Sequence, residues 1–516
     1  MKGIELEIFN KLFSSIAEEM GIVLRRSAFS PNIRERCDFS CAIFDATGEL
    51  VSQASHIPVH LGAMPETMKR ILPLFEWKQG DIVITNDPFC GGTHLPDVTL
   101  IKPVFFNSKL RFFLINRAHH ADIGGKFAGS MAVSTSIEEE GIRITPRYLY
   151  KEGSLDEKFF KCLISSLRNP HERYGDFNAQ IASLRRGEQR LLEMLKTYGE
   201  ARLEEACFSL KKYSETAMRS LLKEIPKAKS EFEDFLDDDG VGTKDIAIRV
   251  RVEVLEDEVI VDFSKSDPQV RGCVNAPVAV TQSCVYYVFL CLLNTKGEYP
   301  INHGCFKPIK IITKSGTIVD AEYPSAVAGG NVETSQRIVD AILGALSEVV
   351  PELIPAASCG SMNNIAIGNE SFAYYETVAG GMGARPGKDG LSAVHTHMTN
   401  TLNTPVEALE HEYPIVIEEY RIRNGSGGKG KFRGGDGLVR SFLFLQDCSV
   451  TILSERRLRC PYGLFGGEPG KCGENWLIKA DGKRVKLDPK VNLHLKKGDK
   501  IVMLTPGGGG WGKVES

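Results

Sequence analysis

Cysteine pairs of the kind that bind zinc or build a disulfide framework are missing from this sequence. It contains 13 cysteines, an odd number, and none of them forms a Cys-x-x-Cys pair. The closest two are Cys37 and Cys41, in a Cys-x-x-x-Cys arrangement. This scatter argues against a disulfide framework and a four-cysteine zinc site, and it favours a reducing compartment.

Long apolar runs and an excess of one charge are also missing. The longest apolar run, Val285–Leu293, is far shorter than the roughly 20 residues that cross a bilayer. Sixty-three basic residues oppose 66 acidic ones, so the net charge of −3 gives no reason to expect nucleic acid or an anionic membrane as partner. Glu5 and Glu7 lie where a signal peptide has basic and then apolar residues. We therefore expect a cytoplasmic protein without membrane or nucleic-acid binding.

Nucleotide-binding motifs are almost absent. The sequence has no G-x-x-x-x-G-K-[ST] motif, and its G-x-G-x-x-G stretch, Gly425–Gly430, is followed by Lys-Phe-Arg-Gly-Gly-Asp. That continuation is a poor start for a helix, whereas the dinucleotide fingerprint needs a helix there. We therefore assign no cofactor-binding residues to a nucleotide site in this chain.

Glycine, in contrast, is abundant and unevenly distributed. The chain has 50 glycines, and 26 of them fall in residues 351–516. Because glycine permits tight turns and apolar runs lie between these glycines, this part should be rich in β-strands. The predicted fold is mixed α+β. Its expected regions are an α/β metal-site region (1–175), a helical segment (176–240), a central α/β region with substrate-side loops (241–415) and a glycine-rich β region (416–516).

Apolar periodicity predicts several helices. Residues 4–24 carry an apolar side chain at every fourth position, which is typical of an amphipathic helix. Residues 177–224 are charged and helix-forming, and should make one long helix or two consecutive ones. A further helix is expected at 335–349, and the acidic stretch 231–239 is interpreted as an exposed junction.

Histidine is scarce, but three of the 11 histidines lie in two loops that also contain aspartate. One loop carries His94 and Asp97, and the other carries His119, His120 and Asp122. Both follow short apolar strands, so both should emerge at one end of a sheet, where sites are common. Imidazole with carboxylate is a ligand set for Zn²⁺, Mn²⁺ or Fe²⁺. Spacing alone leaves metal binding and loop hydrogen bonding open, and it adds two upstream candidates, His60 and Asp38.

A second polar cluster follows a glycine-rich loop. His395, His397 and Asn400 come after Ala379–Gly387, and such a stretch could offer imidazoles and amides to a polar substrate. A loop that satisfies its own backbone is the equal alternative. Asn331 with Glu333, and the stretch Ser361–Asn364, leave the same two alternatives open.

Several longer strings resemble the hydantoinase B family. They run from near the start of the chain to its end and occur in the following order: Arg34-Glu-Arg-Cys-Asp38, His56-Ile-Pro-Val-His60, Asn86-Asp-Pro-Phe-Cys-Gly-Gly-Thr-His94, His119-His120-Ala-Asp122, Glu138-Glu-Glu-Gly141, Gly330-Asn-Val-Glu-Thr-Ser-Gln336, His395-Thr-His397-Met-Thr-Asn400 and Pro506-Gly-Gly-Gly-Gly510. The family includes the B-type subunits of N-methylhydantoinases, the C-terminal half of 5-oxoprolinase and the alpha-type subunits of acetone and acetophenone carboxylases.

The resemblance implies a division of labour between two subunits. An A-type ATP-binding partner phosphorylates a carbonyl oxygen of the substrate, and the B-type chain completes the reaction at a metal site. The implied activity is ATP-dependent hydrolysis of a cyclic amide, such as a hydantoin or 5-oxoproline, in a hetero-oligomer that uses ATP through the partner. The implied cofactor is a divalent ion, with Zn²⁺ or Mn²⁺ expected.

The resemblance also assigns roles to the candidate residues. It implies metal ligands at Asp38, His94, His119 and Asp122. It implies that Asp97 is a base or supporting carboxylate, with His60 and His120 as helpers. The substrate side would be lined by His395, His397 and Asn400.

Two other functions compete with this interpretation. One is a subunit of an ATP-dependent ketone carboxylase of the acetone or acetophenone type, which bicarbonate-dependent ATP turnover would reveal. The other is a non-catalytic scaffold for the partner, which the presence of the candidate ligands disfavours.

Overall fold

A seven-stranded antiparallel sheet organises the N-terminal part of the chain. The computed structural model describes residues 1, 3–54 and 56–514. The strand order is β2-β1-β5-β4-β3-β6-β7. The bounds are β1 Phe39–Asp45, β2 Leu50–Gln53, β3 Ile82–Thr85, β4 Asp97–Phe106, β5 Lys109–His119, β6 Arg147–Lys151 and β7 Ser154–Leu155.

Both faces of this sheet are covered, because its strands are apolar on both sides. Successive side chains of a strand point to opposite faces. Cys41 and Ile43 accordingly join the core under α1 (Gly3–Ser27) and α6 (Pro170–Tyr198). Ala42 and Phe44 join a second core shared with α3 (Ala63–Ile71) and α8 (Val278–Asn294). Short elements complete this half: α2 Pro31–Arg34, η1 Pro58–His60, η2 Leu72–Leu74, η3 Pro88–Cys90, α4 Ile137–Glu140 and α5 Glu157–Ser165.

The predicted helices are confirmed. Residues 4–24 lie in α1, and 335–349 overlaps α10 (Ser335–Ser347). The charged stretch 177–224 forms two consecutive helices, α6 and α7 (Glu200–Glu224), which are separated at Gly199. Gly199 has a positive φ of 79°, a conformation that glycine adopts without strain, so the first helix ends there.

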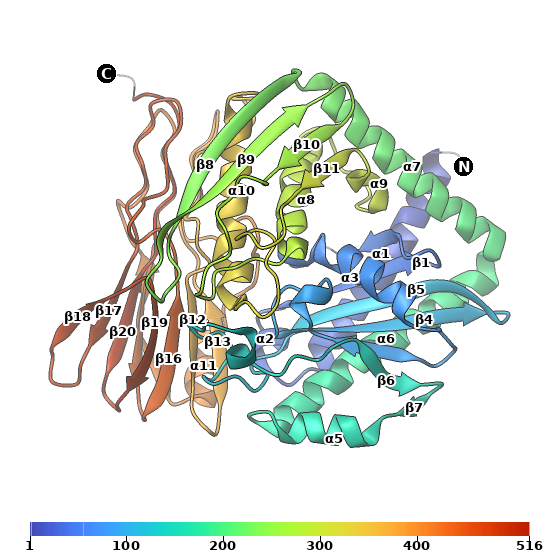
Figure 1. Cartoon of the computed structure of the whole chain (residues 1–516), viewed down its shortest axis with the longest axis horizontal. Helices are drawn as coiled ribbons and strands as arrows, with labels where there is room; N and C mark the ends of the chain where they lie inside the picture. The colour runs from blue at the N-terminus through green and yellow to red at the C-terminus, as the bar shows by residue number, and fades with distance from the viewer. Residues whose placement is uncertain (2, 55, 515–516) are drawn as a thin grey trace.

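A second sheet lies over α8 and α10 in the middle of the molecule (Figure 1). Its order is β11-β10-β9-β8, with β10 and β11 parallel and the other pairs antiparallel. The elements of this region are β8 Ala228–Asp238, β9 Lys244–Val254, β10 Val259–Asp262, α9 His303–Phe306, β11 Ile309–Ile312 and η4 Gly330–Thr334, a π-helical turn that leads into α10.

The prediction of an exposed junction at 231–239 is wrong. This stretch lies in β8 and just beyond it, and several of its acids are buried. The buried Asp234 carboxylate pairs with Arg456 at 2.6 Å and Arg337 at 3.3 Å. A buried charge persists when it is paired and hydrogen-bonded. The acidic run therefore has distant basic partners, which composition alone does not reveal.

Two further sheets form the C-terminal part, at the left of Figure 1, and share one apolar core. Their orders are β13-β12-β16-β19 and β14-β15-β20-β17-β18. The bounds are β12 Asn364–Gly368, β13 Ala373–Thr377, α11 Val406–Glu412, β14 Ile415–Ile422, β15 Leu438–Phe444, β16 Cys448–Leu453, β17 Glu474–Ile478, β18 Arg484–Leu487, β19 Lys490–Leu495 and β20 Lys500–Leu504. The predicted mixed α+β fold with a strand-rich C-terminal part is confirmed.

Many C-terminal glycines pack backbone against backbone as well as forming turns. Segments 380–384, 427–435, 463–470 and 507–510, which we term the polyglycine layer, lie so close together that a Cβ at Gly383, Gly434 or Gly509 would meet another segment's carbonyl. The segments are joined by hydrogen bonds, including Gly428 N to Gly508 O at 2.9 Å. The G-x-G-x-x-G stretch lies largely in this layer, which explains its glycines without a nucleotide.

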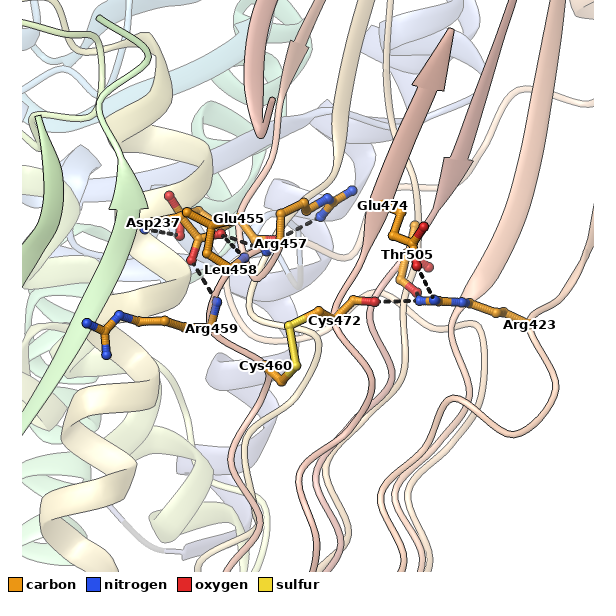
Figure 2. The surroundings of a disulfide bond; sticks show 10 residues. All are labelled: Asp237, Arg423, Glu455, Arg457, Leu458, Arg459, Cys460, Cys472, Glu474 and Thr505. Carbon is orange, nitrogen blue, oxygen red and sulfur yellow. Dashed lines mark hydrogen bonds and ion pairs between the residues drawn. A yellow bond between two sulfur atoms is a disulfide. The ribbon is translucent and has the colours of Figure 1, made fainter. Parts of the chain in front are cut away.

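One disulfide joins Cys460 to Cys472, with Cα atoms 4.5 Å apart (Figure 2). Asp237 anchors the chain before Cys460 by accepting the backbone N–H groups of Arg457, Leu458 and Arg459. The other 11 cysteines are free, so the chain has no disulfide framework, but the pair itself is not evident from cysteine spacing. Within the described ranges, no helix combines the length and the apolar character that crossing a bilayer requires.

Candidate metal centre

Three strand ends bring the predicted site residues together. β1 begins just after Asp38, β4 begins at Asp97 and β5 ends at His119. Because β1 and β4 both pair antiparallel with β5, these three ends lie at the same edge of the sheet. Asp97 and His119 are direct register partners, and His119 N donates to Asp38 O at 3.0 Å. Sequence reasoning that placed both loops at one sheet edge therefore agrees with this arrangement.

Three buried atoms form a nearly equilateral triangle at this edge. His94 Nε2 lies 3.1 Å from Asp97 Oδ1, His119 Nδ1 lies 3.2 Å from the same oxygen, and the two nitrogens are 3.2 Å apart. Asp97 Oδ1 is buried without a hydrogen-bond partner. Ligands about 2.1 Å from one ion lie roughly 3.0–3.4 Å from each other. The donor set and its spacing therefore fit a divalent cation.

The other carboxylate oxygen of Asp97 holds the group in place. Asp97 Oδ2 accepts a hydrogen bond from Thr93 and lies 3.2 Å from His60 Nε2, while His60 Nδ1 pairs with Ser40 at 2.9 Å. Burial alone would raise the pKa of Asp97, but the imidazoles of His94 and His60, with hydrogen bonds from neighbouring histidines, hold it well below its usual range. The carboxylate is therefore an anion with one oxygen fixed and one available.

A small cavity adjoins this triangle. Its volume is about 20 Å³, which is room for about one water molecule. Asp38, His60, Asp97 and His119 line it together with residues from the second half of the chain, namely Asn331, Tyr375, Thr377, Met398, Thr399 and Thr401. The site is therefore assembled from widely separated parts of the sequence.

Asp38 and the predicted helper residues differ in where the structure places them. Asp38 lines the cavity, and its Oδ2 lies 4.0 Å from His119 Nδ1, just outside the triangle. Asp122 instead accepts the N–H groups of Gly124 and Gly129 and pairs with Arg168 at 2.9 Å. Its interactions shape its own loop.

His120 also has partners away from the triangle. Its Nε2 lies 3.0 Å from Gln180 Oε1, and its ring packs on Phe177 of α6. Burial lowers the pKa of His120 to about 4, so this imidazole is neutral near pH 7. The adjacent residue, His119, points to the opposite face of the strand, as alternation along β5 requires.

The predicted substrate-side residues border other surroundings than the cavity. His395 Nε2 lies 3.4 Å from Asn403 Oδ1, and His397 Nε2 lies 3.6 Å from Asp340 Oδ1. Asn400 is exposed and donates to His56 O at 3.1 Å. The cavity wall is formed instead by their neighbours Met398, Thr399 and Thr401.

Sequence reasoning missed a buried cation and several lining residues. Arg36 is fully buried and donates to Tyr375 O at 3.0 Å, Thr377 Oγ1 at 3.1 Å and Thr401 Oγ1 at 3.3 Å. Asn331 Nδ2 lies 3.3 Å from His94 Nε2, and the Tyr375 ring stacks on His119 with centroids 4.6 Å apart. Asn331 was visible only as part of a polar stretch, and Arg36 only as a neighbour of Asp38.

Known proteins similar to this chain are found over almost its full length. An uncharacterized protein of Methanocaldococcus jannaschii is 43% identical over 99% of this chain and 91% of its own length. A Pseudomonas protein described as the B-type component of a D-/L-hydantoinase is 32% identical over 96% of this chain and 88% of its own length. The 5-oxoprolinase of Dictyostelium discoideum is 40% identical over 99% of this chain. The chain spans only 40% of that longer protein.

Two solved structures have the same fold. The ATP-dependent caprolactamase from Pseudomonas jessenii superposes with a TM-score of 0.92 at 27% identity, covering 99% of this chain and 91% of that one. A nucleotide-free acetone carboxylase superposes with a TM-score of 0.92 at 17% identity, covering 99% and 76%, and this likeness concerns the fold alone. The family match extends over residues 2–514. On this evidence, the chain belongs to the Hydantoinase B/oxoprolinase family.

Proposed function

We propose that this chain is the B-type component of an ATP-dependent cyclic amide hydrolase. In this proposal an A-type partner phosphorylates the carbonyl oxygen of the substrate, and this chain completes ring opening at the His94–Asp97–His119 centre. Membership of the family and the likeness to a caprolactamase and a hydantoinase component support the substrate class. The observation that carries the proposal is the triangle of donor atoms 3.1–3.2 Å apart beside a water-sized cavity.

The three triangle residues would hold a divalent ion such as Zn²⁺ or Mn²⁺. Two imidazole nitrogens and one carboxylate oxygen form a common donor set for these ions. When bound, the ion would supply Lewis acidity that activates water at neutral pH. The hydrogen bonds of Asp97 Oδ2 leave Oδ1 as the donor atom, so Thr93 and His60 act as positioning residues.

Asp38 is the residue that we assign to proton transfer. It lines the cavity and lies outside the triangle, so its carboxylate faces the space where water would sit. A carboxylate within hydrogen-bond reach of a reacting water accepts its proton as a general base. In this assignment Asp38 Oδ2 takes the proton that the attacking water loses.

The substrate chemistry explains why a partner and ATP are needed. Resonance makes an unstrained cyclic amide a poor electrophile, and phosphorylation of its oxygen makes the carbonyl carbon reactive. Attack by water then cleaves the C–N bond, the nitrogen leaves with its electron pair and gains a proton, and the phosphoryl group is released as phosphate. This chain contributes the enclosed site in which water competes for the activated carbon.

The test is reconstitution of the chain with an A-type partner. We expect ADP release coupled to ring opening of 5-oxoproline, a hydantoin or caprolactam, and we expect the His94→Ala complex to assemble without turnover. ATP turnover that depends on a ketone and bicarbonate would contradict the proposal in favour of a carboxylase. Unchanged turnover in the His94→Ala complex would contradict the role of this centre.

A further inference from the structure

We propose that Thr377, Thr399 and Thr401, supported by Arg36, form a binding site for the phosphoryl group of the activated substrate. This inference rests on the proposed function and deepens it, because it assigns one wall of the same cavity to one part of the substrate. All three threonines line the cavity next to Asp38 and His119. They come from the end of β13 and from the following segment 396–404.

The three hydroxyl groups form a connected row. Thr377 Oγ1 lies 2.9 Å from Thr401 Oγ1, which lies 3.4 Å from Thr399 Oγ1. Each hydroxyl has one proton and can both donate and accept. Two contacts within the row use at most two of the three protons, so at least one O–H remains to donate to a ligand. Hydroxyl donors around a small cavity suit a group with several acceptor oxygens.

Arg36 gives this row its polarity. Its guanidinium is fully buried, and Nη2 donates to both Thr377 Oγ1 and Thr401 Oγ1. Because these oxygens accept from a cation, their own protons are directed away from Arg36. The same guanidinium lies 3.9 Å from Asp38 Oδ2, which connects the row to the catalytic side of the cavity. Hydrogen bonds to charged groups are stronger than those between neutral groups.

The charges around the cavity favour an anion once a divalent ion is present. Asp38 and Asp97 bring two negative charges, and burial lowers the pKa of His119, which keeps that imidazole neutral. A divalent ion would balance the two carboxylates, and the positive charge of Arg36 would remain. A buried excess of positive charge attracts a negatively charged ligand because the surrounding dielectric is low. A cyclic amide is neutral, so its phosphoryl group is the part that matches this charge.

Binding requires the cavity to enlarge. Its volume of about 20 Å³ admits about one water molecule, which is less than a phosphate group needs. Segment 396–404 forms the outer wall and is held to the N-terminal part by Leu402 N to Arg36 O and Asn400 Nδ2 to His56 O, both at 3.1 Å. Outward movement of this segment would admit the phosphoryl group while its threonines remain in contact with it.

The test measures binding of inorganic phosphate to the full-length chain loaded with Zn²⁺ or Mn²⁺. Val replaces Thr with nearly the same shape but no hydroxyl, so the variants are Thr377→Val and Thr401→Val. The matched control is Thr404→Val, because Thr404 is buried on the same segment but does not line the cavity. We expect calorimetric phosphate affinity to fall about tenfold or more in the two cavity variants and to stay unchanged in the control. Metal content, measured by elemental analysis, should be equal in all four proteins.

Three results would overturn the inference. They are an absence of phosphate binding by the wild-type chain, equal affinity in all four proteins, and loss of metal from the cavity variants, which would place the threonines in support of the metal instead. The reconstituted ring-opening assay separates this inference from the proposed function. A wild-type complex that opens lactams while phosphate affinity ignores Thr377 and Thr401 refutes only the phosphoryl site. A complex without lactam hydrolysis, whose phosphate binding depends on those threonines, refutes only the hydrolase assignment.

Discussion

At the scale of single residues, Asp97 has a different task for each of its carboxylate oxygens. Oδ2 is fixed by Thr93 and His60, whereas Oδ1 faces two imidazole nitrogens. Such a division is common at metal centres, where a supporting hydrogen bond orients the ligand. It also separates Asp97 from Asp122, which is equally buried but bound to Arg168 and to its own loop.

These two aspartates provide a matched test of the metal site. Asp97→Asn removes the negative charge from the triangle, so we expect the bound metal per chain to fall at least tenfold. Asp122→Asn alters a similarly buried carboxylate outside the triangle, so metal content should stay near that of wild type. Elemental analysis after gel filtration measures both. Equal loss in the two variants would mean that Asp122 supports the ion as strongly as Asp97 does.

Asp38 allows a second residue-scale prediction. Asp38→Asn removes the proposed proton acceptor without changing the triangle, so kcat for ring opening should fall by about 10²-fold or more. Metal content should be retained. If the metal is lost together with activity, Asp38 is a ligand and the assignment of proton transfer to it is wrong. Steady-state kinetics of the reconstituted complex and elemental analysis distinguish the two outcomes.

The site residues differ in how far the sequence can predict them. His94, Asp97 and His119 are predictable as a group, because scarce histidines follow strands that pair as neighbours. Arg36 and Thr401 are not, because their contact joins positions 365 residues apart and depends on the packing of separate sheets. The same reasoning applies to His120, whose alternation along β5 directs it to α6 although it adjoins His119.

At the scale of elements, the π-helical turn η4 and α4 are joined through Glu140. The buried Glu140 Oε1 accepts the N–H groups of Val327 and Ala328 at 2.9 and 3.0 Å, just before η4, and also the hydroxyl of Ser134. These bonds fix the start of the turn that carries Asn331 to His94. π-helical turns are rare and often occur at functional sites.

Burial gives this junction a pH dependence. It raises the pKa of Glu140 to about 8, against an ordinary value of 4.5. Because the folded state holds the proton more tightly than the unfolded state, this group's contribution is fully present below pH 4.5 and is lost as pH rises toward 8. The loss is about 1.4 kcal/mol per pH unit in that window.

Glu140→Gln should therefore flatten the stability profile. Glutamine cannot ionise, and its oxygen can still accept the same N–H groups. We expect the free energy of unfolding to decline less between pH 5 and pH 8 in the variant than in wild type, as measured by urea denaturation across this range. Parallel profiles for the two proteins would show that Glu140 does not control the pH dependence.

Elements also show where periodicity suffices and where it fails. The helices α1, α7 and α10 follow from apolar spacing and helix-forming residues, because each buries one face against a neighbour. β8 does not, since its acidic residues mimic a solvated linker until Arg337 and Arg456 supply their partners. Buried ion pairs between distant segments are therefore the main source of error in the sequence interpretation.

At the scale of the whole molecule, the polyglycine layer ties the C-terminal half together without side chains. Gly509 N donates to Ala357 O at 2.8 Å, and Gly509 O accepts from Ala384 N at 2.9 Å. A Cβ at Gly509 would meet the carbonyl of Tyr462. Composition predicts a glycine-rich β region, but it cannot distinguish glycines in turns from glycines packed between backbones.

This packing predicts the effect of one added methyl group. Gly509→Ala should lower the free energy of unfolding by about 2 kcal/mol or more, because backbone segments on both sides must move. The control is Gly3→Ala in α1, where a Cβ meets nothing within 4 Å, and it should be neutral or slightly stabilising. Chemical denaturation of both variants provides the comparison, and equal stability of the two would contradict the packing.

Because glycines have no rotamers to restrict, ordering the polyglycine layer costs backbone entropy only, and the inter-segment hydrogen bonds must offset that cost together. Those amide protons are shielded from solvent by neighbouring main chains. In deuterated buffer they should exchange late and in one cooperative step, at the rate of global opening. A stretch whose composition resembles a flexible linker would then be among the slowest-exchanging parts of the protein.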